Sequence, residues 1–137
     1  MKILDLFGKK DVTQEVGKTL PYRIYAEFIP FKLYANRKSS TMLLLKVKNL
    51  TTEPVLGSVV VSVPRGIRLD ETGLSAEKEL KLGTLAASEE KEARANIYGD
   101  SGTDKGDYTL SITAFIHYRD YGHVLNAVRK KAILEVV

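Results

Sequence analysis

The chain of 137 residues contains no cysteine, no tryptophan and only two histidines. The lack of cysteine excludes disulfide bonds, thiolate metal sites and cysteine nucleophiles. No apolar run approaches the length of about 20 residues that a membrane-spanning helix needs. The apolar core near the amino terminus is short and Asp5 interrupts it, which is not the pattern of a secretory signal. These absences predict a cytoplasmic protein without a transmembrane segment.

Charge of neither sign dominates the chain. Charged residues make up 28% of it and the formal net charge is +4, but basic and acidic side chains are interspersed. Such a surface permits contact with nucleic acid or anionic lipid without requiring it. Thermolabile side chains are scarce as well, because the chain has one glutamine and four asparagines. This composition is typical of thermophiles, so we expect a thermophilic source.

Short runs of alternating apolar and polar residues are what the sequence does contain. Leu43, Leu45 and Val47 alternate in one run, and residues 108–118 alternate in the longest one. Period two with one apolar face indicates half-buried β-strands. Several such runs at short spacing, without a long helical pattern between them, favour two packed antiparallel sheets. We therefore predict an all-β fold, a single immunoglobulin-like β-sandwich of about seven antiparallel strands.

The predicted domain covers residues 21–137, behind an amino-terminal extension at residues 1–20. Within the domain, strands are expected near 21–36, 41–49, 57–63, 80–85, 90–97, 106–118 and 128–136. Pro30 interrupts the first strand, and the apolar residues change parity there. Because proline cannot donate to a ladder, this strand is predicted to lie at an edge and to change phase or sheet at Pro30. The strand order stays open between an immunoglobulin-like and an arrestin-like arrangement.

Four segments carry a resemblance to a known family. They are Val47-Lys48-Asn49-Leu50-Thr51, Val59-Val60-Val61-Ser62-Val63-Pro64-Arg65-Gly66, Leu82-Gly83-Thr84-Leu85 and Gly106-Asp107-Tyr108-Thr109-Leu110. In this order they resemble the immunoglobulin-like modules of the CARDB and fibronectin-III-like type that are common in archaea, and the resemblance therefore implies an archaeal source. The resemblance implies a tyrosine corner at Tyr108, whose hydroxyl bonds back to the preceding backbone. Those modules usually belong to secreted, multidomain surface proteins, whereas this sequence shows no secretory signal pattern. The resemblance therefore supports the fold rather than a cell-surface role.

The candidate catalytic and metal-binding groups do not combine into a site. Ser111 and His117 lie on one predicted strand, about 20 Å apart at about 3.3 Å per residue, which defeats a serine triad with Asp120. His117, Asp120 and His123 surround a predicted hairpin and could bind a metal ion only if the loop folded back. The glycines within residues 99–106 lack the following helix that a phosphate loop needs. We predict a chain that is not an enzyme and holds no cofactor or metal.

Surface residues that the core does not need are the remaining candidates. Strands 57–63, 106–118 and 128–136 are expected to share one sheet, whose outward parity includes Ser58 and several apolar side chains. A contiguous exposed apolar patch usually marks an interface, and tyrosine and arginine often dominate binding energies. The candidate partner-binding residues are Val60, Phe115, His117 and Ile133 on this face and Tyr118, Arg119, Tyr121 and His123 on the hairpin. The alternatives are a face covered by residues 1–20 and a merely solvated hairpin.

The sequence therefore predicts a non-catalytic protein-protein interaction or assembly module. Its partner is another protein, including a second copy of the same chain. The alternative is a protein that binds nucleic acid or an anionic membrane surface through basic residues. Two basic groups support that alternative, namely Arg129-Lys130-Lys131 and the lysines that flank the apolar residues Ile3, Leu4, Leu6 and Phe7.

Overall fold

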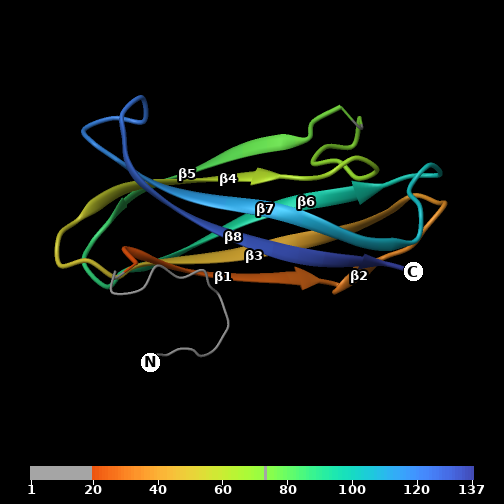
Figure 1. Cartoon of the computed structure of the whole chain (residues 1–137), viewed down its shortest axis with the longest axis horizontal. Helices are drawn as coiled ribbons and strands as arrows, with labels where there is room; N and C mark the ends of the chain where they lie inside the picture. The colour runs from red at the N-terminus through yellow and green to blue at the C-terminus, as the bar shows by residue number, and fades with distance from the viewer. Residues whose placement is uncertain (1–19, 73) are drawn as a thin grey trace.

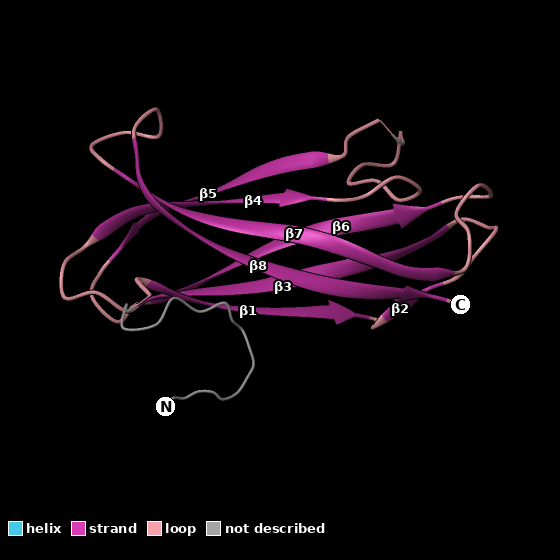
Figure 2. Ribbon diagram, in the orientation of Figure 1, coloured by secondary structure: helices cyan, strands magenta, loops and turns pink. Residues whose placement is uncertain are grey.

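The computed structural model describes residues 20–72 and 74–137, which form two β-sheets packed face to face (Figure 1). Figure 2 shows only strands and loops in this part of the chain. The three-stranded sheet has the order β1-β3-β6, with strands at Tyr22–Ile29, Ser39–Asn49 and Glu90–Gly99. The five-stranded sheet has the order β2-β8-β7-β4-β5, with strands at Lys32–Leu33, Val124–Val136, Gly106–His117, Val55–Ser62 and Glu77–Leu85. The predicted all-β sandwich is confirmed.

The first predicted strand is divided between the two sheets. β1 is an edge of the three-stranded sheet and ends at Ile29, which precedes a cis peptide bond to Pro30. β2 then pairs in parallel with the end of β8, through Lys32 and Leu33. The predicted change of sheet at Pro30 is thus confirmed. It also explains why the described residues form eight strands, with β2 parallel to β8, where about seven antiparallel strands were expected.

The core lies between the sheets and takes alternate residues from each strand. From β3 it takes Leu43, Leu45 and Val47, none of which is exposed. Further fully buried apolar side chains come from β4, β7 and β8, namely Val59, Val61, Leu110, Ile112, Ala114 and Leu134. Truncating a buried leucine to alanine typically costs about 2–5 kcal/mol, so this alternation is the main source of stability. β4, β7 and β8 share one sheet, as predicted.

Two polar side chains fix the connections between strands. The Tyr108 hydroxyl donates a hydrogen bond of 2.7 Å to the backbone oxygen of Asp104, which is the tyrosine corner that the resemblance implies. Asn49 is fully buried, and its Nδ2 donates to the backbone oxygen of Glu53 at 2.9 Å. Its Oδ1 accepts a hydrogen bond of 2.9 Å from the Thr51 backbone N–H. Asn49 is therefore a structural residue of the β3–β4 turn.

The predicted domain boundary falls beside β1. Leu20 and Pro21 precede this strand, and the rest of the predicted extension lies outside the described residues. Within the part of the chain that the structure describes, no helix is long and apolar enough to cross a bilayer.

Candidate protein-binding site

The β7–β8 hairpin projects from one end of the sandwich (Figure 1). Its turn is closed by a hydrogen bond of 2.8 Å from the Tyr118 backbone N–H to the His123 oxygen. Asp120 Oδ1 lies 2.8 Å from His123 Nδ1 and accepts a bond of 2.9 Å from the Gly122 N–H. These two contacts, that with His123 first, hold the pKa of Asp120 below its usual range. The Arg119 guanidinium stacks 5.0 Å from the Tyr118 ring centroid.

Tyr121 fastens this hairpin to the five-stranded sheet. Its hydroxyl accepts a hydrogen bond of 3.0 Å from the Gly83 backbone N–H, beside a β-bulge in the pairing of β4 with β5. Gly83 has a φ of +73°, which glycine adopts without the usual steric cost. Lys81 Nζ lies 5.0 Å from the centroid of the Tyr121 ring, and this ring meets that of His117 edge-on at 5.1 Å. The sheet therefore fixes the position of the hairpin.

His117 is buried beneath this hairpin, and the expectation that Ser58 and His117 face solvent is wrong. His117 is 6% exposed and Ser58 is 0% exposed, because Tyr121 folds back over this end of the sheet. The His117 Nε2 lies 2.7 Å from the Ser58 Oγ. The buried Nδ1 has no hydrogen-bond partner among the described residues, so no carboxylate orients this ring as a serine triad requires. Nor does any group of three or more potential metal ligands lie together within residues 20–72 and 74–137.

The remaining candidates on the outer face of the five-stranded sheet do not form one patch. Val60 and Phe115 are half-buried, and the Phe115 ring centroid lies 6.0 Å from that of His117. Ile133 is 64% exposed but pairs with Thr109, near the other end of β7. Phe115 and Thr109 are about 20 Å apart along this strand at about 3.3 Å per residue. The expected contiguous apolar face is therefore two separate groups.

The exposed start of β8 is a feature that the sequence reasoning missed. β8 begins at Val124 rather than at Val128, and Val124 and Leu125 are 56% and 65% exposed. The strand can start there because Val124 pairs with His117 beyond the core, next to a bulge. Together with the predicted Tyr118 and Arg119, these residues form what we name the hairpin surface. The signal was the apolar pair that directly follows the turn residues 120–123.

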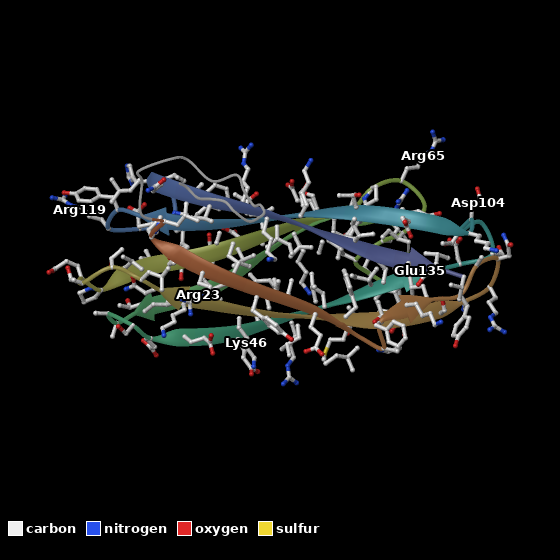
Figure 3. The ribbon with its side chains drawn as sticks, turned by 60° about the horizontal axis from the view of Figure 1, so that its bottom comes forward. Arg23, Lys46, Arg65, Asp104, Arg119 and Glu135 are labelled. Atoms are coloured by element: carbon white, nitrogen blue, oxygen red, sulfur yellow. The ribbon has the colours of Figure 1, made fainter. Side chains whose placement is uncertain are left out.

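The opposite end of the molecule carries a hollow of about 740 Å³. Figure 3 shows Arg65 and Asp104, which line it, far from Arg119 on the hairpin. Its polar groups already serve the surrounding loops. Asp70 accepts a hydrogen bond of 3.1 Å from the Ser75 backbone N–H, and this bond, followed by one from the Thr72 hydroxyl, lowers the pKa of Asp70 to about 2. With cations and carboxylates both around its rim, this hollow favours no ligand charge.

No family model matches the chain, and no curated protein matches it. Solved structures, in contrast, share its fold. One is a CARDB domain from Pyrococcus furiosus in complex with di-metal ions, which is 18% identical with a TM-score of 0.51, over 85% of both chains. Another is the alkylpurine DNA glycosylase AlkC of Pseudomonas fluorescens, bound to DNA containing an abasic site analogue. It is 15% identical with a TM-score of 0.52, and the match covers 85% of this chain but only 30% of the glycosylase.

A PapD-like domain of human CEP192 is 14% identical with a TM-score of 0.45, over 95% of this chain and 97% of that domain. At these identities a likeness concerns the fold alone, and the first two structures carry it. The chain has the immunoglobulin-like β-sandwich fold of CARDB domains.

Proposed function

We propose that this chain is a non-catalytic protein interaction module that binds a partner through the hairpin surface. The observation that carries the proposal is the exposed pair Val124 and Leu125, presented on a hairpin that Tyr121 fastens to the sheet. Recognition residues on immunoglobulin-like sandwiches typically lie on loops that a rigid scaffold positions. Tyr118 and Arg119 add the residue types that most often dominate binding energies. The cytoplasmic location and the thermophilic, archaeal source stay predictions from the sequence.

A partner that meets this surface gains apolar burial without ordering the hairpin. Burial of apolar surface contributes about 25 cal/mol per Å², and a preformed site avoids much of the entropy cost of ordering a loop. His123 and Asp120, which are exposed and bonded to each other, lie beside the apolar pair and would belong to the polar rim. The surface therefore has an apolar centre and a polar border, as protein interfaces commonly do.

Nucleic acid or an anionic membrane is the second candidate, because Arg129, Lys130 and Lys131 are all exposed on β8. The likeness to a DNA-bound glycosylase adds little support for this candidate, because the match covers only 30% of that protein. Binding to phosphates weakens steeply as salt rises, whereas apolar protein contacts do not. No retention on heparin at low salt, together with no binding to duplex DNA or to anionic lipid vesicles, would count against this candidate.

The experiment is a quantitative affinity purification from the native cell with matched variants. Leu125→Asp places a charge in the hairpin surface, and Leu74→Asp makes the same change at a leucine that is 83% exposed in the loop before β5. We expect the wild type and Leu74→Asp to recover the same proteins and Leu125→Asp to lose at least one of them. Sedimentation of the three purified chains over a range of concentrations tests a second copy as the partner. If neither assay separates Leu125→Asp from the control, the proposed surface is refuted.

A further inference from the structure

Within the described part of the chain, one edge of the five-stranded sheet lacks a neighbouring strand along most of its length. β8 pairs with β7 on one side, and on its other side β2 covers only Glu135 and Val136. Among residues 20–72 and 74–137, nothing pairs with that side of residues 124–134. Figure 1 shows β8 running diagonally along the sheet, with β2 only at its far end. An edge of this length is a template for another strand.

The contacts at the carboxyl end of β8 show which backbone groups point to this open edge. The Val137 N–H donates to the Leu33 oxygen at 2.9 Å, and the Val137 oxygen accepts from the Ala35 N–H at 2.8 Å. Both backbone groups of Val137 thus face the β2 side, and the same holds for every second residue of a regular strand. The pairing with β7 is regular from Asn126 to Val136. The free N–H and carbonyl groups therefore belong to Ala127, Arg129, Lys131 and Ile133.

The side chains of these four residues define what could pair with them. Leu134 and Val136 point into the core, so the alternate residues face outward. Arg129 and Lys131 form the middle of this outward row, and the smaller Ala127 and the exposed Ile133 flank them. None of the cations on β8 forms an ion pair within the described residues. The row therefore offers two unpaired positive charges between two apolar side chains.

A second copy of the chain is a poor occupant of this edge. Antiparallel pairing of two β8 strands would bring Arg129, Lys130 and Lys131 of both copies together, and like charges opposite one another are destabilising. A second copy could instead offer another outer edge, such as β5 with its acidic Glu77 and Glu79. Lysines alternate with these glutamates, so that edge does not match the charge of β8. Same-sign charge on β8 thus disfavours self-pairing while leaving the edge open to a strand of opposite charge.

We propose that β8 binds an extended acidic segment of another protein as an added strand of the five-stranded sheet. This inference rests on the proposed function, whose partner class it specifies. The segment would place carboxylates opposite Arg129 and Lys131 and apolar side chains opposite Ala127 and Ile133. Main-chain hydrogen bonds to the open edge supply affinity, and the charges select the partner and its register.

The test uses a synthetic peptide with this pattern, acetyl-Trp-Gly-Val-Thr-Glu-Thr-Glu-Thr-Val-amide. Its last seven residues read alike in both directions, so they fit either strand orientation. Because the chain has no tryptophan, the peptide's fluorescence reports binding to the full chain directly. We expect saturable binding that a peptide with lysines in place of the glutamates lacks. Two N-methylated isomers of the peptide test the main-chain pairing. One is methylated at both glutamates, and the other at the threonines between and after them. Their affinities should differ by about tenfold or more, because only alternate peptide groups face β8.

Paired variants of the chain complete the test. Arg129→Glu with Lys131→Glu should weaken the acidic peptide about tenfold or more and create affinity for the lysine peptide. Lys46→Glu with Lys48→Glu makes the same change of net charge on β3 of the other sheet and should leave binding unchanged. The proposal would be overturned if both pairs of substitutions weakened peptide binding equally, or if the two methylated isomers bound with equal affinity. It would also be overturned if duplex DNA competed for the chain as well as the unlabelled acidic peptide does. If Leu125→Asp loses a cellular partner but the wild-type chain does not bind the peptide, the edge site alone is refuted. If the chain binds the peptide but Leu125→Asp keeps every partner, the hairpin surface alone is refuted.

Discussion

The hydrogen bond between Ser58 and His117 makes a stability prediction that can be worked from the structure. Ser58→Ala removes the hydroxyl at 2.7 Å from Nε2, and the Nδ1 of the same buried ring already lacks a partner within the described residues. A buried polar group left unpaired costs about 1–3 kcal/mol. For a domain of this size, that loss lowers the melting temperature by about 3–12 °C. Urea unfolding at neutral pH measures the change, with an unchanged m-value as the sign of a pure stability effect.

The matched control and a double variant make this prediction refutable. Ser111→Ala removes an exposed hydroxyl from the outward row of β7 and should change stability by less than about 0.5 kcal/mol. His117→Phe keeps an aromatic ring against Tyr121 but leaves Ser58 unpaired, so it should also destabilise. The double variant Ser58→Ala with His117→Phe removes both polar groups. Its free energy of unfolding should exceed the value expected from adding the two single changes by about 1 kcal/mol or more. If Ser58→Ala is as stable as Ser111→Ala, the reasoning is wrong.

Three further predictions concern the strand connections and the response to pH. Tyr108→Phe should cost about 0.5–1.5 kcal/mol in urea unfolding, because it removes the bond of 2.7 Å to the Asp104 backbone oxygen. Burial, and after it the nearby Tyr121, raises the pKa of Tyr22 to about 12 from its usual value near 10. The protonated Tyr22 therefore contributes its full stabilisation below pH 10, and this contribution is lost as pH rises toward 12. Tyr22→Phe should therefore lose less stability than the wild type over that range of a thermal-unfolding series. The pKa of Asp70 is lowered to about 2, so its carboxylate stabilises the folded state above the unfolded pKa near 4, and this stabilisation is lost as pH falls through 2. The stabilities of the wild type and Asp70→Asn should therefore converge as pH is lowered in acid unfolding.

The fold could be predicted because its determinants are local in the sequence. The alternation of Leu43, Leu45 and Val47 specifies which face of β3 is buried, whatever the partner strands are. Pro30 marks a change of sheet because proline lacks the N–H that a ladder needs, and this consequence does not depend on distant residues. The tyrosine corner at Tyr108 was implied by the family resemblance, and its hydroxyl bonds to a residue only four positions earlier. Each of these signals lies within one strand or one turn.

The candidate site was only partly predictable because exposure depends on distant segments. Parity placed His117 on the outer face correctly but could not show that Tyr121 covers it, since that arrangement needs the bond to Gly83 across the sheet. The contact between His117 and Ser58 joins residues 59 positions apart and has no local signature. The hairpin residues Tyr118 and Arg119, by contrast, were proposed from residue type and turn position alone, and their role in binding stays a prediction.

By itself, the sequence determined that this protein is a β-sandwich, because period-two alternation and turn residues act over a few positions. It also determined that the surface candidates lie on the sheet of β4, β7 and β8 and on the hairpin that joins β7 to β8. Only the tertiary structure decided which of them meet solvent. Burial of His117, exposure of Leu125 and the open edge beside Arg129 all follow from how strands far apart in the chain are paired and where that pairing stops. Long-range pairing is decided by the assembled sheets as a whole, and no short stretch of residues encodes it.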